Sequence, residues 1–283
     1  MEKLISLYNI ASSSGKEKQM AKFIIAELNS MGITYKKDRC GNVYAVKGNA
    51  KTYPCIVSHM DEVHRRKTGT YGAYAVDDKM IVGYDYLNRK MTGIGADDKN
   101  GIWICLKALE NFKDMKCVFF VKEEVGCIGS GGADMDFFSD CRYVIQCDRK
   151  GDRDLITRIG MSELCSREFI EKIHPERYGY VVCSGMTTDV HALKTRGLGI
   201  SCINLSCGYY NPHTDSEYTI WEDLLKCFRF VCHIVKTYLT VSIHAPGARQ
   251  YPRFGWFNDD DFYYSPLDYP YCERLKKDRN AKM

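Results

Sequence analysis

Short apolar runs alternate with stretches of helical periodicity along most of this chain, and this alternation constrains the fold more than any other feature. The runs at Tyr53–Ser58, Met115–Val121 and Tyr143–Cys147 have the length of buried strands, whereas Ile102–Leu109 and Ile220–Leu239 carry apolar residues at helical spacing. Strands that alternate with helices indicate a largely parallel sheet that is covered on both faces. We therefore predict an α/β fold of three layers, with a mostly parallel central sheet between helices, in a single domain.

The same patterns predict the shorter elements. We expect further helices at 2–11, 16–31, 133–138, 162–173 and 190–196, and further strands at 33–37, 42–47, 155–159, 180–183 and 199–205. Residues 65–92 mix glycine, tyrosine and β-branched residues, which indicates one or two hairpins. Ser14 is a candidate N-cap for the second helix, and Val125–Gly132 is expected to be a loop because it is rich in glycine.

The composition fits one large domain with a short appendage. At 283 residues, 45% of them hydrophobic, the chain can bury a sizeable core. We predict a domain over residues 1–245. Residues 246–283 carry Pro, Tyr, an Asp-Asp-Asp run and a basic end with little periodicity, so we expect a C-terminal tail that packs on the surface or is partly disordered.

Charge and cysteine usage exclude several classes of partner. The net charge is +4 with the charged residues interspersed, so we expect no nucleic-acid partner, and without an uninterrupted run of 18 apolar residues we expect no membrane span. The fourteen cysteines are scattered, lack Cys-x-x-Cys spacing and often lie inside apolar runs. Because the start of the chain does not resemble a signal peptide, we predict reduced, buried thiols and a cytoplasmic location.

Histidine and acidic side chains lie at the ends of predicted strands. In open α/β sheets the functional groups gather beyond the carboxyl ends of the strands, so we expect these side chains to share one rim of the sheet. Five of them follow strands, and one lies at the entrance of the helix that starts near residue 98. They are His59, Asp97, Glu123, Glu124, Asp148 and His213.

This mixture of imidazoles and carboxylates favours a metal site of zinc type. Carboxylates packed together without a cation would repel each other, whereas an acid that bridges two divalent ions about 3.5 Å apart makes a co-catalytic site. Asp61 lies two residues after His59 and can accept its second ring N–H. An alternative interpretation of the adjacent Asp97 and Asp98 is that they only cap the following helix.

The order of these motifs resembles the co-catalytic di-zinc exopeptidase superfamily. It is most similar to peptidase T and related di- and tripeptidases, with the single-domain di-zinc aminopeptidases as relatives. The resemblance runs from about Leu4 to Leu239. The motifs that carry it are His59-x-Asp61, Gly95-Ala-Asp97-Asp98-Lys99-x-Gly101, Glu123-Glu124-Val-Gly126, Asp148, Asn211-x-His213-Thr214, Ser14-Gly15-Lys-Glu and Asp38-x-x-Gly41-Asn-Val-Tyr.

The resemblance implies a metal ligand set. Asp97 would bridge two Zn²⁺ ions, for which Co²⁺ or Mn²⁺ are possible substitutes. His59 and Asp148 would complete one site, and Glu124 and His213 would complete the other.

The resemblance also implies roles for residues around the ions. Glu123 would be the general base, Asp61 would orient His59, and the Asp97–Asp98 peptide would be cis, as in many such enzymes.

One departure from the family concerns the lid domain that peptidase T-like enzymes insert after the position of Asp148. Here only residues 149–183 separate Asp148 from Ser184-Gly-Met-Thr-Thr-Asp189, where the catalytic domain resumes. We therefore expect no lid, no lid histidine and no lid-mediated dimer; the oligomeric state is left open. Tyr209 and Tyr210 are candidates to stabilise the oxyanion in place of the lid histidine, or are packing aromatics.

We predict a metal-dependent hydrolase that cleaves the peptide bonds of small peptides through a water bridging two zinc ions. It would act as an aminopeptidase or as a di- or tripeptidase. Two alternatives stay open. One is a deacylase or amidohydrolase that acts on N-acyl amino acids at the same site, and the other is a non-catalytic binding protein on a peptidase fold.

Overall fold

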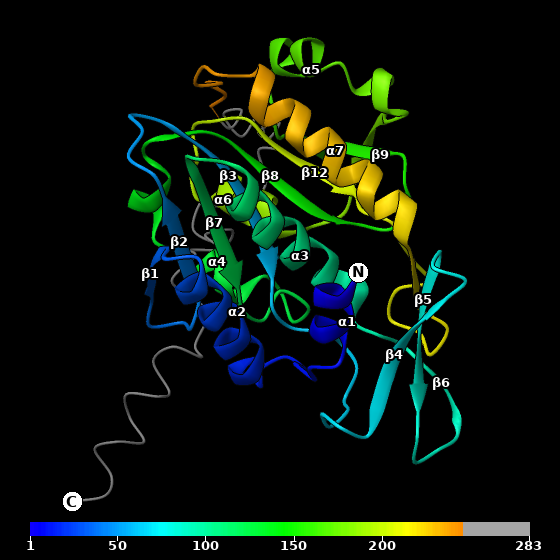
Figure 1. Cartoon of the computed structure of the whole chain (residues 1–283). Coiled ribbons are helices and arrows are strands. Elements are labelled where there is room, and N and C mark those ends of the chain that lie inside the picture. The colour runs from blue at the N-terminus through cyan, green and yellow to red at the C-terminus, as the bar shows by residue number, and fades with distance from the viewer. Residues whose placement is uncertain (246–283) are drawn as a thin grey trace, which may run out of the picture. The chain divides into compact units, whose positions relative to one another are not determined.

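Four adjacent parallel strands form the centre of the fold in the computed structural model, which describes residues 1–245 (Figure 1). They are β3 (Tyr53–His59), β7 (Met115–Phe120), β8 (Cys141–Arg149) and β12 (Cys202–Ser206), in the order β7-β3-β8-β12. Every residue of β3 and β7 is buried, as the continuous apolar runs predict for strands covered on both faces. The predicted tail, 246–283, lies outside the described residues.

The outer strands make the sheet mixed. The order of the main sheet is β1-β2-β7-β3-β8-β12-β9-β10, with β11 paired to β9, and β2, β9 and β10 run antiparallel to their inner neighbours. The segment that follows Asp148 therefore extends the main sheet, and in residues 1–245 it builds no separate lid. The outer strands are β1 (Thr34–Lys37), β2 (Val43–Lys47), β9 (Asp154–Ile159), β10 (Ser162–Glu163) and β11 (Val181–Gly185).

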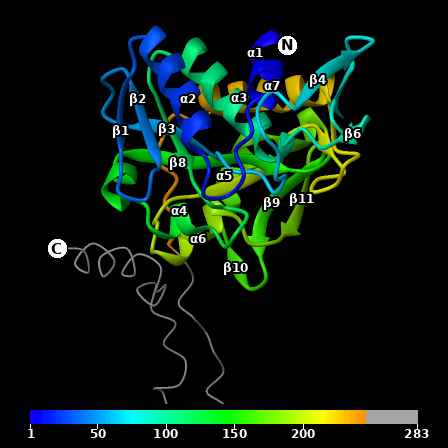
Figure 2. The same cartoon turned by 90° about the horizontal axis from the view of Figure 1, so that it is seen from below.

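Helices cover both faces of this sheet, so the predicted three-layer fold is confirmed (Figures 1 and 2). Alternate residues of β7 point to opposite faces: Phe119 joins the core under one helical layer, and Val118 joins the core under the other. One layer contains α1 (Glu2–Tyr8), α2 (Lys18–Ser30), α3 (Ala96–Asn111), α5 (Arg167–Ile173), α7 (Trp221–Thr237) and the 3-10 helix η2 (Pro175–Tyr178). The other contains α4 (Ile128–Gly131), α6 (Asp189–Thr195) and the 3-10 helix η1 (Met135–Phe138).

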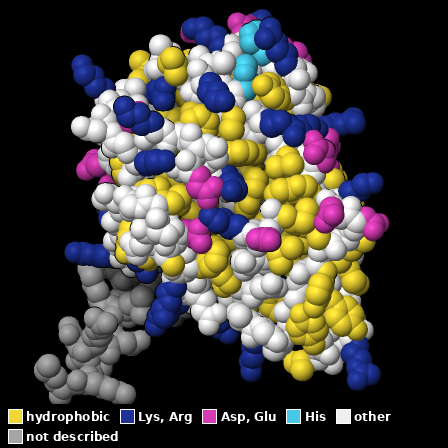
Figure 3. Space-filling view, viewed as in Figure 1, with side chains coloured by type: hydrophobic (Ala, Val, Ile, Leu, Met, Phe, Trp, Pro, Cys, Tyr) yellow, Lys and Arg dark blue, Asp and Glu magenta, His cyan; other side chains and the backbone are white. Residues whose placement is uncertain are grey.

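A second, smaller sheet contains the hairpins predicted for residues 65–92. Its order is β13-β14-β5-β4, with β6 paired to β5. Hydrophobic side chains gather over this sheet in Figure 3. The exposed hydrophobic residues of its strands and turns include Tyr74, Leu87 and Met91. The sheet joins the loop that carries His213 to the segment that leads into α3. Its strands are β4 (Tyr71–Val76), β5 (Met80–Asp85), β6 (Lys90–Thr92), β13 (Tyr209–Tyr210) and β14 (Tyr218–Ile220).

Three local predictions are wrong. Residues 162–173 do not form one helix, because Ser162–Glu163 pairs with β9 and the helix begins only after Ser166, whose hydroxyl accepts the Phe169 N–H (3.1 Å). The Val125–Gly132 segment is not entirely loop, since it contains the single turn α4. Ser14 does not cap α2, since its hydroxyl donates to Asp61 instead (2.7 Å).

All cysteines in residues 1–245 are free thiols, and most are buried. None of the helices in this part of the chain is long and apolar enough to cross a membrane.

A buried ion cluster fixes the loop that enters α3. Glu62 Oε2 lies 2.9 Å from Lys99 Nζ and 2.6 Å from Arg66 Nη2, and all three side chains are almost fully enclosed. Lys99 also donates to the Ile94 carbonyl (3.1 Å), and the other Glu62 oxygen accepts the Ser12 N–H (3.1 Å). The cluster thus joins the N-terminal loop, the segment after β3 and the start of α3.

We predict that Glu62→Gln lowers the free energy of unfolding by about 3–5 kcal/mol, because it leaves two buried cations without their carboxylate. Urea unfolding of the metal-free protein measures this. Glu222→Gln is the matched control: its ion pair with Arg229 is exposed, so its loss should cost about 0–1 kcal/mol. Equal costs for the two substitutions would contradict the assigned role of the cluster.

Candidate metal centre

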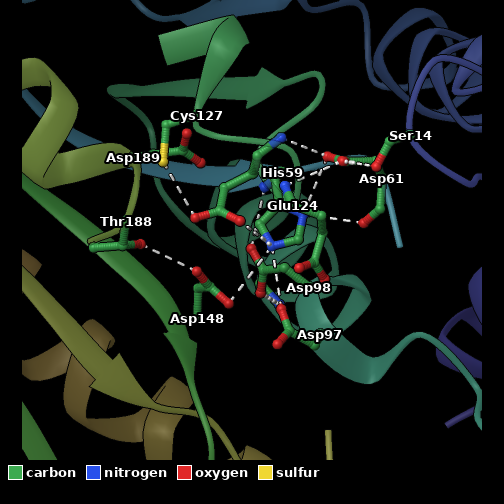
Figure 4. A network of polar contacts seen from close by, with 12 residues as sticks. Ser14, His59, Asp61, Asp97, Asp98, Glu124, Cys127, Asp148, Thr188 and Asp189 are labelled. Atoms are coloured by element: carbon green, nitrogen blue, oxygen red, sulfur yellow. Dashed lines mark hydrogen bonds and ion pairs between the residues drawn. The ribbon is translucent and has the colours of Figure 1, made fainter. Parts of the chain in front are cut away.

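The carboxyl ends of the central parallel strands bring His59, Glu124 and Asp148 together, and Asp97 lies beside them (Figure 4). His59 is the last residue of β3, and Asp148 is the last but one of β8. Glu123 and Glu124 follow β7 after Lys122, whose positive φ of 56° turns the chain toward the rim. His213 lies in the loop between β13 and β14. We call the cluster of His59, Asp97, Glu123, Glu124, Asp148 and His213 the candidate metal centre.

Asp97 lies between the two imidazoles. Its Oδ1 is 3.1 Å from His59 Nε2, and its Oδ2 is 3.3 Å from His213 Nε2. Each oxygen of one carboxylate therefore faces a different histidine. This is the placement that a carboxylate bridging two ions requires.

A further carboxylate accompanies each imidazole. Asp148 Oδ1 lies 3.6 Å from His59 Nε2, and Glu124 Oε1 lies 3.1 Å from His213 Nε2. Ligand atoms of His59, Asp97 and Glu124 also lie within 4.8 Å of one another. The shortest imidazole–carboxylate contacts thus define two adjoining sets that share Asp97.

Asp61 connects the histidine to the Glu-Glu turn. His59 Nδ1 lies 3.4 Å from Asp61 Oδ1 and 3.0 Å from the Asp61 carbonyl oxygen. The Asp61 carboxylate also accepts the backbone N–H groups of Glu123 (2.9 Å) and Glu124 (3.3 Å) and the Ser14 hydroxyl (2.7 Å). One buried side chain therefore orients parts of both ligand sets.

The two adjacent aspartates at the start of α3 have different surroundings. The Asp97–Asp98 peptide is cis, and Asp97 faces the candidate metal centre. Asp98 accepts the Gly101 N–H (3.0 Å) through Oδ1 and the His59 backbone N–H (3.1 Å) through Oδ2. The helix-capping interpretation thus describes Asp98. One oxygen of Asp98 also lies within 4.8 Å of ligand atoms of His59 and Asp148, and the sequence gave no indication of this proximity.

The sequence reasoning also missed Glu217, which holds the backbone around Asp97. Its buried carboxylate accepts the N–H groups of Ile94 (2.9 Å), Gly95 (2.7 Å) and Asp97 (3.2 Å). No sequence signal distinguishes this acid from an ordinary loop residue, because its partners, these backbone groups and the His64 side chain, are more than a hundred residues away.

Asp189 is a second missed acid, at the start of α6. It is fully buried, it receives one long hydrogen bond from Gln146 (3.4 Å), and its Oδ1 accepts no hydrogen bond. Burial raises the Asp189 pKa to about 6, although the charge of His59 opposes this. Its sequence signal is the Ser184-Gly-Met-Thr-Thr-Asp189 motif, which resembles the point where the catalytic domain resumes but does not predict a buried acid.

Glu123 lies beside both ligand sets. Its Oε2 is 4.0 Å from His59 Nε2, and its Oε1 accepts the Cys127 thiol (3.4 Å). Burial raises the Glu123 pKa to about 8; the charge of His59 opposes this shift, and the nearby Asp189 and Asp97 add to it. A carboxyl with a pKa near neutrality can both take and return a proton.

The two tyrosines that are candidates to stabilise the oxyanion differ in their distance from the candidate metal centre. The Tyr209 hydroxyl donates to Asp97 Oδ2 (3.1 Å) and Asp148 Oδ1 (3.4 Å), so it lies within the cluster. The Tyr210 hydroxyl donates to Asp223 (2.6 Å), which is not part of the cluster. Tyr209 is therefore the better placed of the two.

The donor set fits divalent cations. Four carboxylates surround two imidazoles, and burial together with Asp97 raises the Asp148 pKa well above its usual value. Glu124 Oε1 is buried and close to His213, yet it accepts no hydrogen bond of normal geometry. Excess buried carboxylates and an oxygen without a hydrogen bond indicate that cations belong in this cluster, and nitrogen and oxygen donors of this kind suit zinc.

Comparison with known proteins shows the fold. No family model matches the sequence, and no curated protein matches it. Among solved structures, an aminopeptidase PepT from Bacillus cereus ATCC 10987 aligns with a TM-score of 0.68 at 14% identity, covering 83% of this chain and 97% of that chain.

Two further solved structures are similar. A tripeptidase from Staphylococcus aureus subsp. aureus Mu50 has a TM-score of 0.66 at 15% identity and covers 82% of this chain and 96% of that one. An aminopeptidase from the archaeon Desulfurococcus kamchatkensis has a TM-score of 0.67 at 16% identity and covers 85% of this chain and 95% of that one. The chain therefore has the fold of these aminopeptidases and tripeptidases.

We predict that zinc binding releases protons at pH 7. Close contacts with the Asp97 and Glu124 carboxylates raise the His213 pKa to about 10, so the imidazole of the metal-free protein is protonated and must lose its proton to bind an ion. Zinc affinity should therefore rise by about tenfold per pH unit for each displaced proton between pH 6 and 8. Calorimetry in buffers of different ionisation enthalpy counts the protons.

His213→Ala should reduce the number of released protons. His174→Ala is the control, because His174 is exposed and its one ion pair within residues 1–245 is with Glu176. Zinc affinity that does not change between pH 6 and 8 would contradict this prediction.

Proposed function

We propose that this chain is a metal-dependent hydrolase that cleaves the peptide bonds of small peptides, as an aminopeptidase or as a di- or tripeptidase. The observation that carries the proposal is the position of Asp97 between His59 and His213, each accompanied by a further carboxylate. The fold shared with aminopeptidases and tripeptidases supports the class of substrate.

The proposed ligand sets follow the geometry. Asp97, His59 and Asp148 would hold one ion, and Asp97, Glu124 and His213 would hold the other, with Zn²⁺ as the proposed metal. Bound there, two divalent ions would polarise the scissile carbonyl and lower the pKa of the attacking water.

Glu123 is the proposed general base. Its carboxylate would take a proton from the water while the water oxygen forms a bond to the carbonyl carbon. When the C–N bond breaks, the protonated Glu123 would give this proton to the leaving amine. Its position beside both ligand sets supports this role.

Asp61 and Tyr209 have proposed supporting roles. Asp61 would keep the His59 ring oriented through Nδ1 and would hold the Glu123–Glu124 turn. Tyr209, whose hydroxyl already donates to two of the ligands, is the candidate to stabilise negative charge on the substrate oxygen.

We further propose that residues 1–245 are the catalytic domain and that the protein is cytoplasmic. All proposed site residues lie in this range, and its secondary structure accounts for the similarity to the solved peptidases. The free, mostly buried thiols support a reducing compartment.

Glu123→Gln should lower kcat/KM by about 10²–10⁴-fold while the metal content stays unchanged, because the amide cannot take the proton. The assay measures hydrolysis of unblocked and N-acylated di- and tripeptides. Glu163→Gln, an exposed change on β10, should retain wild-type activity. Full activity in Glu123→Gln would overturn the mechanism, and hydrolysis of only the N-acylated substrates would replace the peptidase proposal with a deacylase.

A further inference from the structure

A pocket of about 500 Å³ opens beside Glu124. Its walls come from three segments that are distant in sequence, namely the N-terminal loop with Ser14 and Lys16, the segment after β3 with Arg65, and the turn with Glu124. This volume lies within the range of about 300–1,000 Å³ that is typical of small-molecule sites. Because Glu124 lines the pocket, an occupant would contact one of the proposed metal ligands.

Hydrogen bonds from backbone N–H groups join the first two of these segments. The Ser12 N–H donates to Glu62 Oε1 (3.1 Å), and the Glu62 N–H donates to the Ser12 carbonyl (3.1 Å). The Ser14 hydroxyl donates to Asp61 (2.7 Å), the residue that orients His59. The pocket is therefore anchored to the same residues that hold the candidate metal centre.

The charges that line this pocket do not cancel. Glu62 is compensated by Lys99 and Arg66, and Glu124 lies against His213. Lys16 and Arg65 line the pocket with exposed side chains, and neither forms an ion pair within residues 1–245. The uncompensated charge at the pocket is therefore positive.

We propose that this pocket binds a carboxylate of the substrate, with Lys16 and Arg65 as its counter-charges. Cations at this position favour an anionic group and disfavour a free α-amine in the same place. The inference rests on the proposed function and narrows its substrate class to small peptides or acylated amino acids with a carboxylate near the scissile bond. The carboxylate can be the C-terminal α-carboxylate or an acidic side chain, and the test separates these two sources.

The test compares acid and amide forms of otherwise identical probes. One arm uses L-alanyl-L-alanine against L-alanyl-L-alaninamide, and the other uses the 4-nitroanilides of glutamate and glutamine. Binding is measured by calorimetry on zinc-loaded Glu123→Gln protein, and kcat and KM are measured on the zinc-loaded protein with an intact Glu123. Each measurement is repeated in the Lys16→Gln/Arg65→Gln double variant.

Lys18→Gln/Lys67→Gln is the matched control. It removes the same number of positive charges from the same two segments, at exposed residues that do not line the pocket. Zinc content and thermal unfolding of both double variants show whether the centre and the fold stay intact.

We expect the protein that retains Lys16 and Arg65 to bind the acid form of at least one probe pair about tenfold more tightly than the amide form, because a charge-assisted contact is stronger than a neutral one. This preference should vanish in Lys16→Gln/Arg65→Gln through a higher KM at unchanged kcat, and should persist in the control. The pair that shows it identifies the source of the carboxylate. Equal binding of acid and amide in both pairs, or a preference that survives in Lys16→Gln/Arg65→Gln, would overturn the inference.

Failure of the proposed function gives a different result. If the carboxylate preference is present in binding but no probe is hydrolysed, the hydrolase proposal fails and the pocket assignment stands.

Discussion

Crowding of buried carboxylates at one rim of the central sheet is the constraint on which the rest of this structure depends. Asp97, Glu124 and Asp148 approach two imidazoles from three different elements, and burial makes their mutual repulsion expensive. Hydrogen bonds within residues 1–245 do not remove this cost, since Glu124 Oε1 accepts none. Divalent cations are the natural compensation, so fold and metal binding should be coupled.

The scaffold around the rim is built to hold these carboxylates in place. Parallel strands bring their carboxyl ends to one edge, which fixes the origin of each side chain. Glu217 and Asp61 then fix the backbone of the loops by accepting N–H groups at Asp97 and at the Glu123–Glu124 turn. The buried ion cluster around Glu62 joins the start of α3 to the N-terminal loop. Each of these three supporting residues is a buried acid whose carboxylate accepts several hydrogen bonds.

The sequence predicted what periodicity and strand-end position encode. Continuous apolar runs identified the central strands, and the residues that follow them, such as His59, came to the same rim as expected. Contacts that depend on long-range backbone geometry could not be predicted. Glu217 has no local signature, and Ser14 has the features of a helix cap but bonds to Asp61. The sequence likewise does not show which of the two adjacent aspartates caps the helix and which faces the metal centre. In the structure Asp98 caps α3 by accepting the Gly101 N–H.

The measurement that tests this account most directly is the zinc content per chain, after purification without chelator and again after zinc titration, with Asp97→Ala measured alongside. A centre in which Asp97 is shared predicts about two ions per chain and loss of the second ion in Asp97→Ala. One ion or none after titration of the unaltered chain would contradict it, and these residues would then be only an acid cluster at the ends of strands.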